Sequence, residues 1–433
     1  MAEVSVLDGS GGDSRVDVDN SLVPPVESKS TRRRARRALY HRRQFRRLDT
    51  TAPLDADCAG RLKGMAGLGT VWFGRPMRVG YDLSILRRPA AGTARYAVEL
   101  LRAMRETEPR ETIVEFQGWP RTRRGPSPVR RGTNLASEVG WLTVGSMAIA
   151  VRHRLDVWFA PANVVPLLLP RPSVVTVHDV NILDVAAAYD GGYAAYAERV
   201  VQRSVRRARV VLTDSEYSRG RIVARLGVDP DRVVVAYPGI DHVPTWSTDA
   251  PRATLGLPRD YALFVGQTEP HKNVGALVEA WPSCPPDLDL VIAGRIGRDE
   301  AALAAKIDGS PARLRIHRLI DVAEAELGQV YGGARMFLFP SRAEGFGLPP
   351  LEAMRLGVPT AVADAGSLPE VTRGGALLFD PSEPATIADV VHELHCNDDV
   401  RRQLESTGRH VASQYRWAST ADVAWSAIRA AAQ

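Results

Sequence analysis

The feature that most restricts the fold of this chain is the alternation, from residue 77 onward, of short apolar runs with stretches of helical character. Almost every position is apolar in runs such as VVTV, LVIAG and MFLFP. Such runs are typical of parallel strands that helices cover on both faces. Because strand–helix alternation implies right-handed strand–helix–strand units, the pattern predicts an α/β fold with doubly wound parallel sheets.

The predicted strands form two series of six. The first series comprises residues 77–82, 112–116, 157–160, 174–178, 210–214 and 233–237, and the second comprises residues 262–266, 290–294, 314–317, 336–340, 360–364 and 376–380. We therefore expect two Rossmann-like domains, residues 75–245 and 250–410, and a final helix in residues 411–433 that packs back on the first domain. The length of 433 residues suits two domains. Ligands are expected at the carboxyl ends of the strands, in a cleft between the domains.

The first 70 residues lack this periodicity and are rich in Ser, Asp, Gly and Arg, so we expect a disordered tail. Lys29 and nine arginines between Arg32 and Arg47 place ten positive charges there without an acid. Removing them from the net charge of +6 leaves −4 for the rest of the chain, so the fold itself is not basic. The tail is interpreted as a solvated segment or as a contact with an anionic membrane surface, and we favour the membrane. Nucleic acid is not expected as a partner, because no aromatic platform or recognition helix accompanies the arginines.

Metal and disulfide sites are not expected. The three cysteines, Cys58, Cys284 and Cys396, have no CxxC spacing and no clustered histidines beside them. Asp287 and Asp289 have a DxD spacing but precede a predicted strand, at the end of the sheet where ligands do not bind. The chain shows no secretory signal and no apolar stretch of about 18 residues. We expect a cytoplasmic protein, or one held peripherally on the inner face of the plasma membrane.

The string SRAEGFGLPPLEAM, residues 341–354, follows a predicted strand and contains a glycine-bearing loop that leads into a helix. The first turn of a helix accepts prolines such as Pro349 because they lose no helical hydrogen bond there. The N–H groups of Gly347 and Leu348 at this helix start suit a phosphate. Glu344 in the loop and Glu352 in the helix would reach different parts of one ligand, and carboxylates accept hydrogen bonds from sugar and ribose hydroxyls.

Three further segments follow predicted strands. FVGQTEPHKN contains Gly266, His271 and Lys272, and the Lys272 ammonium suits a diphosphate leaving group. VVTVHD ends in His178 and Asp179, and His178 could hydrogen-bond a sugar or relay a proton from an acceptor hydroxyl. Gly92, shortly before Arg95 and Tyr96, would allow a donor or an acceptor to approach closely, whereas Arg95 and Tyr96 are equally well interpreted as packing or salt-bridge residues.

The string EGFGLPPLEAM resembles the signature of glycosyltransferase family four, a family of retaining enzymes with two Rossmann-like domains (the GT-B fold). The resemblance spans roughly residues 78–417. It implies that Glu352 binds the nucleotide ribose and that Glu344 lies by the hydroxyls of the transferred sugar. It further places the backbone of Phe346, Gly347 and Leu348 by the donor phosphates, the nucleobase near Arg318, Leu319 and Ile320, and His178 beside the sugar and the acceptor.

The resemblance implies a metal-independent hexosyltransferase that needs no cofactor and takes GDP- or UDP-hexose as donor, with a glycan or lipid-linked acceptor. Mannose is favoured because FVGQTEPHKN and VVTVHD are similar to bacterial cell-envelope mannosyltransferases. The chain departs from the family where His271 replaces an arginine and Ala94 replaces a glycine. Two alternatives stay open, a nucleotide-sugar 2-epimerase-like isomerase and a non-catalytic nucleotide-sugar-binding protein. The two departures favour the binding protein, and the presence of Glu344, Glu352 and Lys272 opposes it.

Overall fold

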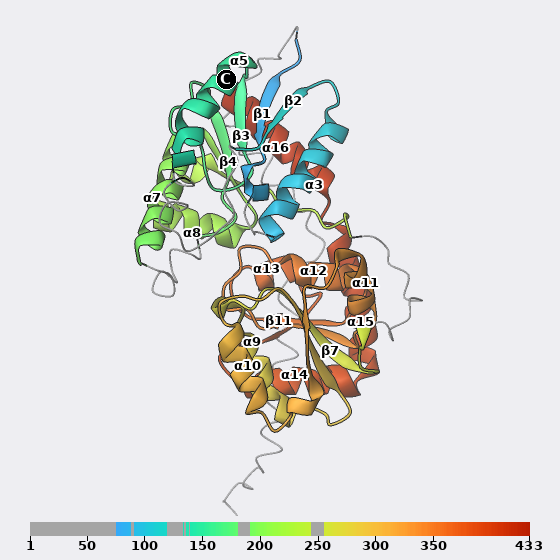
Figure 1. Cartoon of the computed structure of the whole chain (residues 1–433). Coiled ribbons are helices and arrows are strands. Elements are labelled where there is room, and N and C mark those ends of the chain that lie inside the picture. Colours follow the sequence, from blue (N-terminus) through green and yellow to red (C-terminus); the bar gives the residue numbers. More distant parts are fainter. Residues whose placement is uncertain are drawn as a thin grey trace, which may run out of the picture. The chain divides into compact units, whose positions relative to one another are not determined.

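The computed structural model describes residues 75–87, 91–118, 133, 136–137, 139–180, 191–243 and 255–433 (Figure 1). The predicted disordered tail, residues 1–70 with Arg32 to Arg47, lies outside the described residues. Two parallel sheets of six strands form the described part of the chain, which confirms the predicted α/β class and the GT-B architecture.

The first sheet has the strand order β2-β1-β3-β4-β5-β6, and all neighbouring strands are parallel. Its strands are β1 (Arg78–Asp82), β2 (Thr112–Phe116), β3 (Val157–Ala160), β4 (Ser173–Thr176), β5 (Val210–Thr213) and β6 (Val233–Val235). Its helices are η2 (Ser84–Arg87), α3 (Ala91–Thr107), η3 (Trp141–Gly145), α5 (Ser146–Arg152), α7 (Gly191–Arg207), α8 (Glu216–Leu226) and η5 (Pro230–Arg232). The strand order reverses between β1 and β3, and a reversal of this kind opens a crevice at the carboxyl ends of the strands.

The second sheet has the order β12-β11-β10-β7-β8-β9 and is also parallel throughout. Its strands are β7 (Tyr261–Val265), β8 (Asp289–Gly294), β9 (Ile316–Ile320), β10 (Met336–Phe339), β11 (Thr360–Ala363) and β12 (Leu377–Phe379). Its helices are η7 (Pro270–Lys272), α9 (Val274–Ala280), η8 (Trp281–Ser283), α10 (Glu300–Asp308), η9 (Arg313–Arg315), α11 (Glu324–Gly332), α12 (Leu348–Arg355), α13 (Leu368–Thr372), α14 (Pro384–Cys396) and α15 (Asp398–Ser413). Here the order reverses between β7 and β10, so both loops of the second domain that carry predicted site residues meet at one crevice.

The bounds predicted from the sequence for the third strand of the second domain were wrong. The sequence predicted a strand at residues 314–317, but η9 occupies Arg313–Arg315 and β9 begins at Ile316. The guanidinium of Arg315 donates to the carbonyls of Trp281, Pro285 and Leu288, which holds this turn against the neighbouring segment. Arg318 and Leu319 therefore lie inside the strand instead of after it. The polar residues of β9 fit its position at the edge of the sheet.

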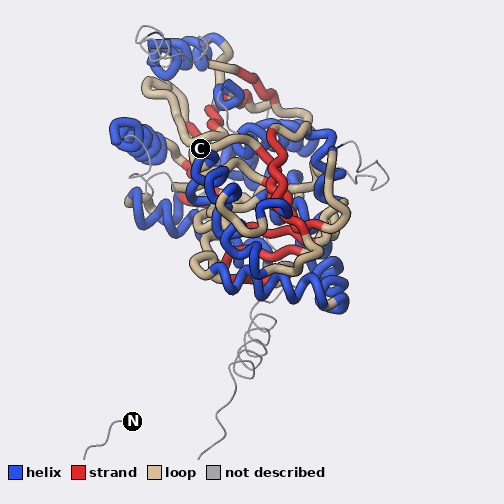
Figure 2. Tube along the Cα trace, turned by 60° about the horizontal axis from the view of Figure 1, so that its bottom comes forward, coloured by secondary structure: helices blue, strands red, loops and turns tan. Residues whose placement is uncertain are grey.

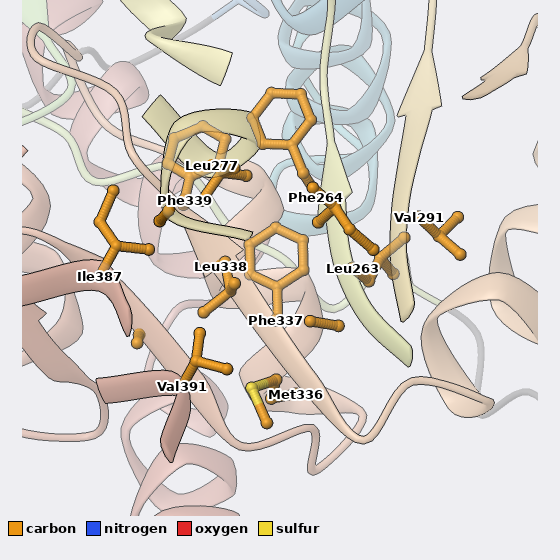
Figure 3. Close-up of a cluster of buried hydrophobic side chains, with 14 of the residues drawn as sticks. Leu263, Phe264, Leu277, Val291, Met336, Phe337, Leu338, Phe339, Ile387 and Val391 are labelled. Atoms are coloured by element: carbon orange, nitrogen blue, oxygen red, sulfur yellow. The ribbon is translucent and has the colours of Figure 1, made fainter. Parts of the chain in front are cut away.

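The second sheet is a closely packed support for the loops at its carboxyl edge. The rings of Phe264 on β7 and of Phe337 on β10 each stack with Phe339, and Ile387 and Val391 of α14 belong to the same buried cluster (Figure 3). Burial of each such side chain contributes about 1.5–3 kcal/mol to folding. Figure 2 shows the strands of the described core running between helices. Because the interior is dense, the strand ends are fixed in position.

The last helix, α16 (Trp417–Ala432), belongs to the core of the first domain. It packs along α3, and the indole N–H of Trp425 donates to the carbonyl oxygen of Met104 over 3.0 Å (Figure 1). Trp417 and Trp425 are both fully buried there. None of the described helices combines the length and the hydropathy needed to cross a bilayer.

Candidate active site

A cavity of about 670 Å³ is lined by loops at the carboxyl ends of strands from both domains. It brings together most of the predicted site residues: Gly92, His178, Gly266, His271, Lys272, Glu344, Phe346, Gly347, Leu348 and Glu352. Leu319 is not among the lining residues, because it lies in β9 and packs against the core of the second domain. Asp321 and Val322, which follow that strand, line the cavity instead.

Lys272 and Glu344 form an ion pair on the side of the cavity that the second domain lines. Lys272 is the last residue of η7, and its Nζ lies 2.6 Å from Oε1 of Glu344. The same ammonium lies 5.0 Å from the centre of the Phe339 ring, within the range of a cation–π contact. Both side chains remain partly exposed to the cavity, at 17% and 11%. A cation and a hydrogen-bond acceptor are therefore available side by side to one ligand.

The loop that carries Glu344 is held from behind. Ser367 Oγ donates to the carbonyl oxygens of Glu344, at 3.1 Å, and of Phe346, at 2.9 Å. Gly347 has a φ of +103°, a conformation that favours glycine, and it directly precedes α12. The ring of Phe346 is buried beside Tyr415, so the side chain anchors the loop while the backbone lines the cavity. The N–H groups at the start of α12 have no partner within the helix, as the phosphate interpretation requires.

His271 joins this loop to the loop after β7 through its main chain. Its carbonyl oxygen accepts from Ser341 Oγ at 3.1 Å and from the N–H of Arg342 at 2.9 Å. Burial is the main cause that lowers the pKa of the His271 imidazole below its usual value. His271 is therefore neutral near pH 7. Of the two neighbours His271 and Lys272, only Lys272 supplies a positive charge.

Glu352 lies at the buried end of the cavity and is held from both domains. Its Oε1 accepts from Nη1 of Arg95 in the first domain at 2.7 Å, and its Oε2 accepts from the hydroxyl of Tyr331 at 3.0 Å. Burial alone would raise the pKa of Glu352, but His242, Arg95 and Tyr331 together outweigh it and the pKa is lowered. The carboxylate is therefore ionised. Each oxygen keeps a lone pair with which to accept a ligand hydroxyl.

His242 lies behind Glu352 with its Nε2 3.7 Å from Oε1, too far for a hydrogen bond. Its Nδ1 accepts from the indole N–H of Trp417 at 3.0 Å. Since Nδ1 accepts, the proton of the neutral ring is on Nε2, and the N–H dipole lies close to the Glu352 carboxylate. This contact favours the ionised form of Glu352 without occupying an oxygen.

His178 sits on the first domain with both ring nitrogens engaged. Nδ1 lies 2.8 Å from Oδ2 of Asp214, and Nε2 lies 3.0 Å from the carbonyl oxygen of Pro161. Burial opposes protonation of His178, but Asp214 and the Pro161 carbonyl outweigh it, and the pKa is raised. Because both partners are acceptors, both nitrogens donate only when the ring is protonated. The imidazole ring packs edge-on against Tyr96, at 4.7 Å between ring centres.

Gly345, next to Glu344, contacts two segments of the first domain. Its carbonyl oxygen accepts from Ser215 Oγ at 2.7 Å and from Ser218 Oγ at 3.1 Å, both at the start of α8. A Cβ at this position would lie 2.5 Å from the carbonyl oxygen of His178. Only glycine therefore fits here.

Sequence reasoning missed several of these residues. Arg95 was left open as a packing or salt-bridge residue, and its partner, Glu352, was not predicted. Asp214 ended a predicted strand but was not linked to His178. Tyr331 and His242 carry no local signal, because they reach Glu352 from distant segments. Gly92, which was predicted to let a donor or an acceptor approach closely, lies in the first turn of α3, and a Cβ there would meet nothing within 4 Å.

The DxD segment lies at the amino end of its strand, as predicted. Asp289 is the first residue of β8 and lies 2.8 Å from Nε2 of His317, and Asp287 lies 3.3 Å from Nε2 of His395. Within the described ranges, no group of three or more His, Cys, Asp or Glu side chains is arranged to hold a metal ion.

Two family models match the chain. The model of glycosyl transferases group 1 matches residues 249–411, and the model of Glycosyltransferase Family 4 matches residues 90–243. Together they cover every strand of both sheets except β1, and all of the residues that line the cavity.

Similar proteins agree with these models. The chain is 26% identical over 372 residues to an O-antigen chain mannosyltransferase B of Escherichia coli, which covers 79% of this chain and 96% of that protein. It is 29% identical over 282 residues to a D-inositol 3-phosphate glycosyltransferase of Streptomyces bingchenggensis, which covers 60% of this chain and 62% of the relative.

Solved structures share the fold. The Anabaena protein Alr3699/HepE in complex with UDP and glucose aligns with a TM-score of 0.61 at 18% identity, over 78% of this chain and 95% of that one. WaaG, a glycosyltransferase involved in lipopolysaccharide biosynthesis, aligns with a TM-score of 0.60 at 16% identity, over 81% and 99% of the two chains.

Proposed function

The chain belongs to the group 1 glycosyltransferases, and we propose that it transfers a hexose, with mannose favoured, from a nucleotide-sugar to a glycan or lipid-linked acceptor with retention of configuration. The observation that carries this proposal is the Lys272–Glu344 pair beside the start of α12, in a cavity that both domains line. A diphosphate is bound by a cation and by amide donors, which Lys272 and the start of α12 offer. A sugar needs acceptors for its hydroxyl groups, and the Glu344 carboxylate is one.

The preference for mannose draws support from the Escherichia coli mannosyltransferase, of which this chain covers 96%. The nucleobase is left open between guanine and uracil. The structural relative Alr3699/HepE binds UDP and glucose, but at 18% identity this likeness concerns the fold.

The roles of the residues are proposed as follows. Glu352 accepts from the ribose hydroxyls, Glu344 accepts from hydroxyls of the sugar, and Lys272 stabilises the departing diphosphate together with the amides of Gly347 and Leu348. This arrangement makes a metal ion unnecessary in the role of charge stabiliser, so turnover should persist in EDTA.

The acceptor side is proposed to lie on the first domain, near Gly92 and His178. In the protonated ring of His178 both N–H groups are engaged, by Asp214 and by the Pro161 carbonyl, so a hydrogen bond to the sugar is proposed to form when Nε2 leaves that carbonyl. A proton relay would require the ring to lose a proton and to leave the Pro161 carbonyl.

A donor screen tests the proposal. Purified protein is titrated with GDP, UDP, ADP and their hexose conjugates while the melting temperature is followed. A ligand at 100 times its dissociation constant should stabilise the fold by about 2.7 kcal/mol. The shift should vanish in Glu352→Gln and persist in the control Glu279→Gln, whose exposed carboxylate pairs with Lys306 away from the cavity.

Product analysis separates the alternatives. Transfer to an acceptor extract supports the proposal, and release of a 2-epimer without any acceptor supports an isomerase. The non-catalytic alternative is favoured by the neutral state of His271, which leaves Lys272 without a charged neighbour at that position. Nucleotide binding without either reaction would establish it and exclude the transferase.

A further inference from the structure

The charges around the cavity do not suit a diphosphate when they are taken together. Five carboxylates line it, namely Asp179, Asp214, Asp321, Glu344 and Glu352, against three permanent cations, namely Arg95, Lys272 and Arg295. Protonation of His178 adds one positive charge beside Asp214. A polyanion therefore binds only where cations are concentrated locally.

Two of these three cations are engaged by carboxylates. Arg95 pairs with Glu352 at 2.7 Å, and Lys272 pairs with Glu344 at 2.6 Å. Arg295 differs, since no carboxylate among the described residues lies within ion-pair distance of its guanidinium, and its side chain is exposed to the cavity. Arg298, three residues further on, is instead paired with Glu269 at 2.7 Å and does not line the cavity.

The main chain fixes Arg295 next to the loop that carries Lys272. Arg295 directly follows β8, and its carbonyl oxygen accepts from the N–H of Thr268 at 3.3 Å. The preceding Gly294 has a φ of +134°, and a Cβ there would lie 2.2 Å from the carbonyl oxygen of Gly266. The two loops are therefore in backbone contact, with the Arg295 side chain at the same edge of the sheet as Gly266 and Lys272.

We propose that Arg295 is the second cation of the donor diphosphate site, acting with Lys272 on the leaving nucleoside diphosphate. This inference rests on the proposed function. When the bond between the anomeric carbon and the diphosphate oxygen breaks, the electron pair stays on that oxygen. The acceptor oxygen forms the new bond to the anomeric carbon, and its proton goes to the departing diphosphate. The planar guanidinium binds two phosphate oxygens at once and keeps its charge at any physiological pH, which the His271 ring does not.

The test uses Arg295→Gln with Arg298→Gln as the matched control, and full-length protein throughout. Calorimetry measures the dissociation constants of GDP, UDP, guanosine and uridine. Arg295→Gln should weaken binding of the nucleoside diphosphate about tenfold and leave the nucleoside unchanged. Turnover with the accepted nucleotide-sugar should fall about 100-fold, because the charge develops in the transition state. Arg295→Lys should recover part of both effects.

A compensating substitution adds a second criterion. His271→Arg introduces a permanent cation at a lining position next to Lys272 in the chain, and it should restore at least about a tenth of the lost turnover in the Arg295→Gln background. If Arg295→Gln binds nucleoside diphosphates and turns over like Arg298→Gln while the wild type is active, the inference is wrong and the proposed function stands. If the wild type binds no nucleotide and transfers no sugar, both the proposed function and the inference on Arg295 are wrong.

Discussion

At the residue scale, the cavity is defined by pairs in which one side chain sets the charge of another. Asp214 and the Pro161 carbonyl raise the pKa of His178, whereas burial lowers the pKa of His271. The pKa values of two histidines in one cavity are thus shifted in opposite directions. The sequence did not predict these shifts, since the surroundings of each histidine come from segments distant in the chain.

The raised pKa of His178 makes stability depend on pH. A histidine whose pKa is higher in the folded state than in the unfolded state stabilises the fold fully below the unfolded value, and this contribution is lost as the pH rises through the folded value. We therefore expect the free energy of unfolding to fall between about pH 6.5 and the folded pKa.

Urea denaturation of the wild type and of His178→Gln between pH 6 and 9 measures this effect. Taking the difference in unfolding free energy between the two proteins corrects for the other titrating groups. This difference should shrink as the pH rises. A constant difference over the whole range would show that His178 is not protonated in the fold.

At the scale of elements, the start of α8 (Glu216–Leu226) receives groups from the second domain. Glu370 on α13 accepts from the N–H groups of Glu216, at 2.7 Å, and Tyr217, at 2.9 Å, and from the hydroxyl of Tyr237 at 2.9 Å. A carboxylate at a helix start is stabilised by the unpaired amides and by the helix dipole. The same helix start binds Gly345 through Ser215. The contact therefore positions the loop that carries Glu344.

Replacement of Glu370 should affect both stability and turnover. Glu370→Ala removes three acceptor contacts, and we expect a loss of about 1–2 kcal/mol of unfolding free energy. Denaturation curves measure it, with Glu383→Ala as the control, since that exposed side chain makes no capping bond to α14. Turnover should fall in Glu370→Ala more than stability alone explains. Equal curves for the two variants would contradict the role given to Glu370.

The elements themselves were largely predictable, for a physical reason. Strands such as β10 and β11 are buried at every position, so their sequences are continuously apolar and bounded by glycine, proline or polar residues. β9 was misplaced because it is an edge strand with polar residues and follows a short turn of arginines. A continuous apolar run in the sequence identifies a strand that is covered on both faces. It does not identify an edge strand that carries polar residues.

At the scale of the whole molecule, the sequence was enough to place residues at the ends of strands. It was not enough to predict which of these residues contact each other. Glu344 and Lys272 were predicted for one site, yet the ion pair of Arg95 with Glu352 joins residues 257 positions apart. No local rule anticipates such a contact, because it depends on how the two domains meet. The same holds for the contact between Ser215 and Gly345.

The basic tail sets a prediction for the molecule as a whole, although it lies outside the described residues. Ten positive charges in residues 28–47 should bind anionic vesicles, and binding should weaken in high salt because the charges are screened. Vesicles of phosphatidylglycerol and phosphatidylcholine are sedimented with the full chain and with a deletion of residues 1–65. Equal sedimentation of the two proteins would exclude the tail as a membrane contact.

The return of α16 to the first domain has a consequence for the gene. The chain passes between the domains twice, and the passes touch, since a Cβ on Gly239 would lie 2.1 Å from the backbone nitrogen of Trp417. The first domain is therefore encoded in two pieces. A fragment ending near residue 245 would leave bare the apolar surface of α3 that Trp425 covers. A stop codon at position 417 would remove Trp417 and Trp425 from the core of the first domain. The buried clusters of the second domain end at Tyr415 and would stay complete.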